Sequence, residues 1–373
     1  MTTTPVREAP PAPRTAQAPA HTRRPVLRRY ALSAMVLAAV AIWVLWRTAP
    51  REVPNLHGFA AVAADWPSAT IDSGFAYTLR VPLGQMLYKL LPAQTPTAFF
   101  VLHLTCLLLV AATLAVWLAR RIGLHRSILA GCILLLAPIT PVLLLWVGMY
   151  DAFSMLAWVL VLMSFDRGRR AQFAAAALAG FQNFEQSVVG VLVLLLIPAL
   201  WRGARWAPHA ASLLAGLGVG KLILELLLSE TGAASGNRLS YLLDDGKGLD
   251  LLASAATAIP ILLWSALGGL WIFAVLGLRR VWRSWQRRQR AMLAAAIIMW
   301  LTSGVLAEDQ TRVLALTSFP AVTAGAIILA SRYRDVVRFV RQPAAWILLL
   351  APPLVLWNNE FLPLSPDAAD QRV

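Results

Sequence analysis

The sequence predicts an all-α protein, a transmembrane helix bundle with about ten or eleven spans. Three observations support this fold class. The chain is 59% hydrophobic and only 14% charged, whereas a soluble domain carries roughly 25% charge. Apolar runs of about 17–25 residues recur along the chain, and each could cross a hydrocarbon layer of roughly 30 Å. The runs are apolar on all sides, whereas a soluble core helix needs only one apolar stripe.

The N-terminal region sets the orientation. Residues 1–24 are rich in Pro, Ala and Thr, which predicts a disordered cytoplasmic tail. Paired arginines precede the apolar run from Tyr30 to Trp46, and no small-residue cleavage site follows it. We therefore expect an uncleaved first span. The positive-inside rule places the N-terminus in the cytoplasm and residues 48–97 outside.

A helical domain is expected over residues 25–357, and it includes this first outer loop. Within the loop, residues 76–91 are amphipathic and suit a helix lying in the membrane interface. The predicted spans that follow are Phe99 to Leu118, Ser127 to Val147 with a bend near Pro138 and Pro141, and Ala152 to Phe165. The bend is expected because proline removes a helical hydrogen bond.

Residues 171–183 and 187–200 are two short apolar segments on either side of Asn183-Phe184-Glu185-Gln186. The first would be only about 20 Å long as a helix. We interpret them as a hairpin that enters and leaves on the inner side. Either the first segment is a half-membrane helix or the tip lies in a protein-lined cavity, because lipid exposure of Glu185 would be costly.

The remaining apolar runs complete the expected topology. They are His209 to Leu228, Leu251 to Leu278, Ala291 to Ala307, Val313 to Ala330, and Ala344 to Trp357, with residues 358–373 as a short outer tail. Nearly every predicted inner loop holds two or more arginines, and the acids gather in the predicted outer loops. This alternation is the pattern by which topology is encoded.

Composition also excludes several classes of protein. The net charge of +15 does not indicate nucleic-acid binding, because the basic residues lie in short loops between spans. Cys106 and Cys132 fall inside spans and are expected to be packing residues. The sequence contains no phosphate-binding Gly-rich loop with a lysine, no HExxH, no GxSxG and no Cys/His cluster. No cofactor or metal ligand set is predicted, although a divalent cation on the carboxylates stays open.

The acids near the predicted outer face each allow two interpretations. Asp65 and Asp72 are either solvated loop carboxylates or a general base facing a cleft at the membrane edge. Asp151 is either a first-turn acid favoured by the helix dipole or a substrate ligand. Glu185 is a candidate substrate ligand, or part of a buried ion pair near one.

Charged residues later in the chain are equally ambiguous. Lys221 and Glu225 are spaced i and i+4 within one span, which fits a neutralised structural pair or an ion pathway. The segment Glu308-Asp309-Gln310-Thr311-Arg312 joins two spans with almost no loop. Its charges either pair with one another, or Arg312 binds an anion such as a lipid phosphate. Arg238 and Arg80 are further candidates for that role.

The layout of these elements resembles the GT-C superfamily of polytopic membrane glycosyltransferases. The resemblance covers roughly residues 30–330. It is carried by the acidic first outer loop with Arg-Val-Pro-Leu-Gly at 80–84, by Gly148-Met149-Tyr150-Asp151, by the broken segments around Glu185, and by Asp309-Gln310-Thr311-Arg312 followed by Pro320.

The resemblance implies sugar transfer from a polyprenyl-phosphate donor at the outer face, during assembly of a cell-envelope glycan. An acid in the first outer loop, Asp65 or Asp72, would be the general base, and basic residues would hold the lipid phosphate. The implied partners are a lipid-linked sugar donor and membrane lipids. The high Ala, Arg and Leu content is typical of a GC-rich bacterium, so the expected location is the bacterial cytoplasmic membrane.

Two other functions fit the same residues. A transporter or flippase would use Glu185, Lys221 and Glu225 within the membrane, whereas a non-catalytic partner of an envelope complex would use none of these residues in chemistry. An outer cleft that joins Asp65 or Asp72 to Arg238 and Arg312 would favour sugar transfer. A cavity around Glu185, Lys221 and Glu225 at the membrane midplane would favour transport.

Overall fold

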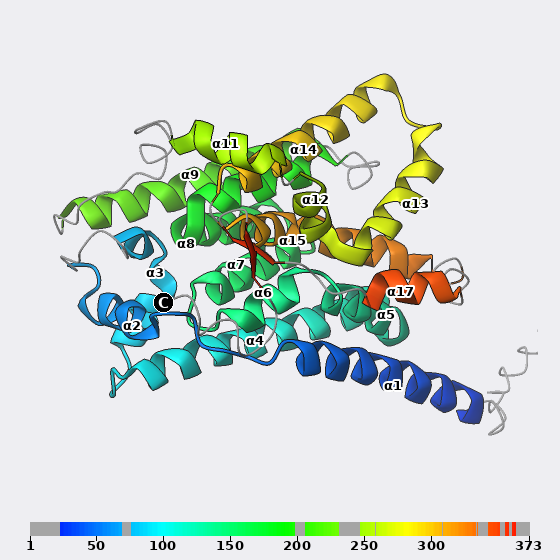
Figure 1. Ribbon diagram of the computed structural model, residues 1–373, viewed down its shortest axis with the longest axis horizontal. Coiled ribbons are helices and arrows are strands. Elements are labelled where there is room, and N and C mark those ends of the chain that lie inside the picture. The colour runs from blue at the N-terminus through cyan, green and yellow to red at the C-terminus, as the bar shows by residue number, and fades with distance from the viewer. Residues whose placement is uncertain are drawn as a thin grey trace, which may run out of the picture.

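The computed structural model of the chain is a bundle of helices (Figure 1). It describes residues 23–68, 76–197, 206–230, 247–257, 259–307, 309–332, 334, 342–350, 355–357 and 360–362.

The helices of the first half are α1 (Arg23–Arg47), α2 (Leu56–Asp65), the 3-10 helix η2 (Ala76–Arg80), α3 (Pro82–Lys89), α4 (Pro96–Ile122), α5 (Leu124–Leu135), α6 (Ile139–Leu145), α7 (Asp151–Ser164) and α8 (Arg169–Leu196). The second half contains α9 (Trp206–Glu230), α11 (Lys247–Thr257), α12 (Ile259–Leu267), the 3-10 helix η5 (Gly268–Leu270), α13 (Trp271–Trp282), α14 (Arg287–Val305), α15 (Gln310–Ser331) and α17 (Pro343–Leu350).

The helices make this a multi-pass membrane protein, but with fewer full-length spans than expected. In the part of the chain that the structure describes, five segments are long and apolar enough to cross a membrane: α4, α8, α9, Ile259–Arg279 and α15. A sixth is the pair α5 and α6, which is bent by 62° where Pro138 and Pro141 predict a bend. The ten or eleven expected spans were counted from apolar runs, and an apolar run does not show how long the helix within it is. Helix α7, for example, has only 14 residues, about 21 Å.

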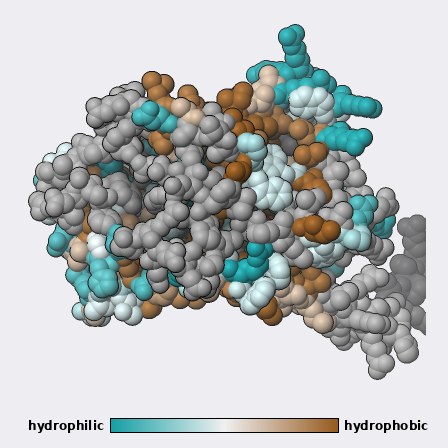
Figure 2. All heavy atoms as spheres, in the orientation of Figure 1, coloured by the Kyte–Doolittle hydropathy of each residue, from teal (hydrophilic) through white to brown (hydrophobic). Residues whose placement is uncertain are grey.

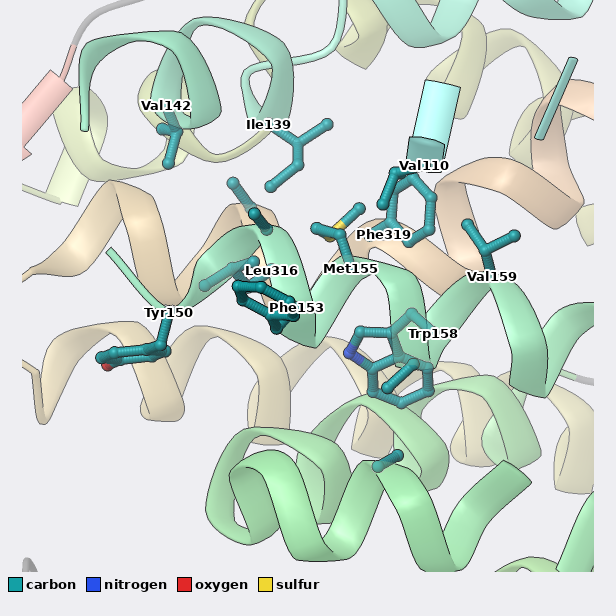
Figure 3. Packing of buried hydrophobic residues seen from close by; sticks show 14 of the residues in the cluster. Val110, Ile139, Val142, Tyr150, Phe153, Met155, Trp158, Val159, Leu316 and Phe319 are labelled. Carbon is teal, nitrogen blue, oxygen red and sulfur yellow. The ribbon is translucent and has the colours of Figure 1, made fainter. Parts of the chain in front are cut away.

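The central helix is α7, which protein surrounds on all sides. Eleven of its 14 residues are buried. Figure 3 shows Phe153, Met155 and Trp158 of α7 packed among side chains of neighbouring helices, including Ile139 of α6 and Phe319 of α15. A helix that is apolar all round can therefore be buried without itself crossing the bilayer.

Segment α8, which reaches spanning length only when taken as a whole, consists of two helical arms that meet at Asn183, whose backbone angles (φ −161°, ψ 84°) are not helical. The Ser187 hydroxyl donates to the Ala179 carbonyl at 3.0 Å, although residues eight apart in a straight helix are separated by about 12 Å. The predicted hairpin is therefore confirmed. Its arms run from Arg169 to the turn and from the turn to Leu196, each too short to cross the membrane alone.

Helix α9 packs parallel to the first arm of this hairpin through glycine contacts. His209 and Gln172 are hydrogen-bonded at one end of the pair (2.9 Å), and Lys221 contacts Glu185 at the other (3.3 Å). A Cβ on Gly220 would lie 2.0 Å from the Ala177 carbonyl oxygen. Small residues spaced four apart allow this close backbone approach, as is common between membrane helices.

The predicted outer loop is folded rather than extended. Trp66 and Tyr88 of this region are buried, whereas Met86, Leu87 and Leu90 expose apolar side chains. This division is what an interfacial helix requires, with one face on protein and another on lipid. The loop begins with a bridge between Glu52 and Val147, which attaches it to the segment before α7.

The C-terminal region differs from the expectation. The predicted last span, Ala344 to Trp357, is not one helix, because α17 ends at Leu350 and Val355–Trp357 is a strand, β1. It pairs antiparallel with β2 (Glu360–Leu362), which lies within the predicted outer tail. Pro352 and Pro353 lie between α17 and β1 and cannot donate the helical hydrogen bonds of a continuous span. The start of α1 at Arg23 also shortens the predicted tail, whose residues 1–22 lie outside the described residues.

The two ends of the bundle differ in character. In Figure 1, α2 and α3 lie at the left, whereas the Arg23 end of α1 and the connection from α13 to α14 lie at the right. Figure 2 shows hydrophilic residues at the upper right, over that connection, where Arg283, Arg287 and Arg288 are exposed. Arginines thus gather at the end opposite the predicted outer loop, as the positive-inside rule requires.

Candidate functional site

The turn of the α8 hairpin organises the polar residues at the end of the bundle where α3 lies. Asn183 begins the second arm in the manner of an N-cap: its Oδ1 accepts from the Gln186 backbone N–H at 3.5 Å, and its Nδ2 donates to Gln186 Oε1 at 2.7 Å. Asparagine is favoured at such positions because its side chain replaces missing backbone partners. The turn therefore holds Phe184 and Glu185 at the tip.

Four charged side chains meet beside this tip, and we call them the charged quartet: Arg80, Glu185, Lys221 and Glu225. Arg80 Nη1 lies 2.8 Å from Glu225 Oε1, and Lys221 Nζ lies 2.8 Å from the same oxygen. Lys221 also approaches Glu185 Oε1 at 3.3 Å. The carboxylates are 40% and 38% exposed, whereas Arg80 and Lys221 are 11% and 21% exposed. The quartet is therefore reachable from outside the protein.

The quartet confirms one predicted contact and adds others. The i, i+4 pairing of Lys221 with Glu225 is present. Sequence spacing could not show that Glu185 and Arg80 join it, because these residues come from α8 and η2. The Lys221 ammonium also lies over the Phe184 ring, with Nζ 5.4 Å from its centre.

The residue after Asp65 packs against sequence neighbours of two quartet residues. The Trp66 indole N–H donates to the Leu79 carbonyl at 3.2 Å. Trp66 and Leu79 pack in one buried cluster with Leu224, the neighbour of Glu225. Asp65 is the last residue of α2 and is exposed. The exposed Asp65 therefore precedes a member of the cluster in which Leu79 and Leu224 pack, and these two residues are the sequence neighbours of Arg80 and Glu225.

Lys89 adds a further positive charge to this surface. Its Nζ donates to the Trp66 carbonyl at 2.7 Å. Sequence reasoning included Lys89 in an amphipathic stretch but did not select it, because a lysine at the end of a helix usually serves the helix dipole. Its position beside Trp66 follows only from the fold of the outer loop.

A second group is almost fully buried, and we call it the buried triad: Asp151, Asp309 and Arg312. Arg312 Nε donates to Asp151 Oδ2 at 2.7 Å, and Arg312 Nη1 donates to Asp309 Oδ2. The Arg312 and Asp151 side chains are 1% and 3% exposed, whereas Asp309 is 18% exposed. The guanidinium also lies over the Tyr150 ring, 4.5 Å from its centre.

The triad decides between the two interpretations of its residues. Arg312 pairs with an acid of its own segment, as one interpretation expects, and also with Asp151, which opens α7 without capping it. Two carboxylates outnumber the guanidinium, so the triad is formally negative and does not attract a phosphate. Within the described residues, the donor Arg312 Nη2 and the acceptor Asp151 Oδ1 are buried without a hydrogen-bond partner. The expected anion site at Arg312 is therefore already filled by carboxylates.

Gln182 connects the two groups and was missed by sequence reasoning. Its Oε1 accepts from the Leu83 backbone N–H at 2.9 Å, and its Nε2 donates to the Tyr150 carbonyl at 3.3 Å. Gln182 is fully buried, so it ties the start of α3 to the start of α7 through the hairpin turn. The available signal was the polar pair Gln182-Asn183 in an apolar run.

Three candidates lie outside the described residues: Asp72, Arg238 and Glu308. The structure therefore brings Arg80 and Glu185 into the charged quartet, and Asp151, Asp309 and Arg312 together in the interior. Asp65 is exposed at the end of α2. Within the described ranges no group of three or more His, Cys, Asp or Glu side chains could hold a metal ion. Cys106 and Cys132 are buried and free, as expected of packing residues.

Comparisons with protein-family models, with characterised proteins and with solved structures find no match for this chain.

Proposed function

We propose that the chain is a membrane glycosyltransferase. It would transfer a sugar from a polyprenyl-phosphate donor at the outer face of a bacterial cytoplasmic membrane, during assembly of a cell-envelope glycan. The observation that carries this proposal is the position of Asp65 directly before Trp66, whose hydrogen bond to Leu79 ties the end of α2 to the residue before Arg80. An exposed acid and the two cations of the quartet at the same end of an apolar bundle are the groups that transfer from a lipid phosphate requires.

Each group has a chemical task in the proposed reaction. The Asp65 carboxylate accepts the proton of the acceptor hydroxyl, whose oxygen bonds to the anomeric carbon of the donor sugar. The bond between that carbon and the phosphate oxygen breaks, and its electron pair leaves on the polyprenyl phosphate. Arg80 and Lys221 stabilise the charge on this leaving phosphate. Asp72 is the alternative base.

Arg312 takes a different task in this proposal from the one its sequence position indicates. Held between Asp151 and Asp309, it positions the start of α7 against α15. Gln182, in the hairpin turn beside the quartet, is hydrogen-bonded to Leu83 and to Tyr150 and so links this turn to the start of α7. We therefore assign phosphate binding to Arg80 and Lys221, and a positioning role to Arg312.

The test is donor turnover by purified protein reconstituted in lipid. A panel of polyprenyl-phosphate sugars is offered with candidate acceptors, and release of polyprenyl phosphate is followed. Asp65→Asn is expected to reduce turnover by about 10²–10⁴-fold, the usual contribution of a general base. Arg80→Gln is expected to reduce turnover as well. Asp250→Asn, which removes another exposed carboxylate, serves as the control and should leave turnover unchanged.

The results separate the two candidate bases. Full activity of Asp65→Asn with loss in Asp72→Asn would transfer the role of base to Asp72. Full activity in both variants and in Arg80→Gln would refute the proposed site. Absence of turnover and of donor binding across the panel would refute the glycosyltransferase.

Transport is the second candidate, and the quartet itself favours it. Glu185, Lys221 and Glu225 are charges on two helical elements within the apolar bundle, and intramembrane charges often mark ion or substrate pathways. In sealed vesicles, a transporter would show solute or lipid flux that Glu185→Gln abolishes. Flux without any donor turnover would replace the first proposal.

A further inference from the structure

An open groove lies at the arginine-rich end of the bundle, away from the quartet and the triad. It has a volume of about 620 Å³ and runs between the C-terminal ends of α4 and α7. This volume falls within the roughly 300–1,000 Å³ of small-molecule sites. Its lining comprises Ala112, Thr113, Val116, Trp117, Arg120, Arg121, Met163, Asp166 and Arg167.

The floor of the groove is basic, and one of its arginines is held in place by neighbouring side chains. Trp117 Nε1 donates to Asp166 Oδ2 at 2.7 Å, and Arg121 forms an ion pair with the other oxygen of the same carboxylate. The Arg121 guanidinium also lies 5.4 Å from the centre of the Trp117 ring. One acid and one tryptophan thus fix the direction of one arginine.

Two further arginines at the floor of the groove are not paired with an acid in the part of the chain that the structure describes. Arg120 and Arg167 are exposed, and neither forms an ion pair with any residue that the structure describes. Three arginines face a single carboxylate, so the floor is positively charged. An anion bound there would find unused forked donors, which suit phosphate oxygens.

The wall above this floor is apolar. Val116 is 50% exposed, and the α4 surface continues away from the floor through exposed Leu108 and Leu109. Since α4 is a candidate membrane span, this surface faces lipid. A ligand that fills the groove therefore needs an anionic head at the membrane boundary and a hydrocarbon chain above it.

We propose that this groove binds an anionic phospholipid of the cytoplasmic leaflet, with its phosphate on Arg120 and Arg167 and one acyl chain along Val116. The arginine-rich end of the bundle is the cytoplasmic end by the positive-inside rule. Basic pockets between membrane helices on that side commonly hold lipid headgroups. Arg121, oriented by Asp166 and Trp117, completes the phosphate contacts.

The experiment titrates the delipidated full-length protein in detergent with phosphatidylglycerol and measures the apparent affinity. Each neutralised arginine is expected to weaken binding by about fivefold. The double variant Arg120→Gln/Arg167→Gln should therefore bind about 25-fold more weakly than wild type. Arg126→Gln is the matched control, because Arg126 is exposed after the same helix but does not line the groove.

The expected results are unchanged binding in Arg126→Gln and much weaker binding of zwitterionic phosphatidylcholine to wild type. Wild-type affinity in the double variant would overturn the site. An equal loss in Arg126→Gln would overturn it in favour of general surface charge. Full competition by millimolar inorganic phosphate would show a free-phosphate site and overturn the assignment to lipid. Thermal unfolding of each variant confirms that the protein remains folded.

Discussion

The buried triad and the charged quartet both pair carboxylates with cations but lie in opposite environments. Arg312 and Asp151 are 1% and 3% exposed, whereas Glu185 and Glu225 of the quartet are 40% and 38% exposed. A buried ion pair must replace all its hydration with protein contacts. A half-exposed pair keeps part of its solvent and can exchange partners. The triad is therefore suited to fixing positions, and the quartet to meeting a ligand.

The largest expected effect comes from breaking the triad. Asp151→Ala leaves the buried Arg312 without its Nε partner, so the free energy of unfolding should fall by about 3–5 kcal/mol. Denaturant titration in detergent micelles measures this change. Asp65→Ala, which removes an exposed acid, should alter stability by no more than about 0.5 kcal/mol. A loss below about 1 kcal/mol for Asp151→Ala would show that the triad is no more structural than the quartet.

A smaller effect is expected from separating α9 from the hairpin. Gly220→Ala places a methyl group 2.0 Å from the Ala177 carbonyl oxygen, and overpacking of this kind costs about 1–3 kcal/mol. The matched control is Gly218→Ala, whose added Cβ meets no atom within 4 Å and should stabilise the helix slightly. Thermal unfolding of both variants checks the prediction. Equal behaviour of the two would mean that the packing of α9 on the hairpin does not depend on this contact.

The smallest effect on stability is expected from the quartet itself. Glu225→Gln removes the carboxylate that Arg80 and Lys221 share, yet partial exposure limits the cost to about 0–1 kcal/mol. Under the proposed function, donor turnover should nevertheless fall, because two phosphate ligands lose their anchor. Unfolding and turnover are measured on the same preparation. A large loss of stability with normal turnover would give the quartet the structural role of the triad.

The sequence predicted individual elements better than their number. The apolar runs located α4, α9 and α15, and Pro138 and Pro141 predicted the bend between α5 and α6. Within the described residues five or six segments are long enough to span a membrane, fewer than the runs counted, because an apolar run does not show whether its helix faces lipid or protein. Helix α7 is an example, since it is short and mostly buried in the protein.

Candidate residues could be chosen by type but not by partner. Glu185 was selected because a charge between two apolar segments is costly to desolvate, whereas Asp151 and Arg312 were selected because they lie at the ends of predicted spans. The i, i+4 pair of Lys221 and Glu225 was predictable because both lie on one helix. The ion pairs that cross the bundle join residues 145 and 161 positions apart, and no local spacing encodes them.

The sequence by itself determined that the chain is a helical membrane protein, that its charges segregate between the two ends, and that the chain turns back around residues 183–186. These features follow from local hydropathy and from the cost of charge in lipid. Only the tertiary structure decided that Arg312 lies between Asp151 and Asp309, that Asn183 is the residue at which the helix breaks, and that Arg80 joins Glu225. Such pairings depend on how distant helices pack, because side chains far apart in sequence become partners only when packing brings their backbones together.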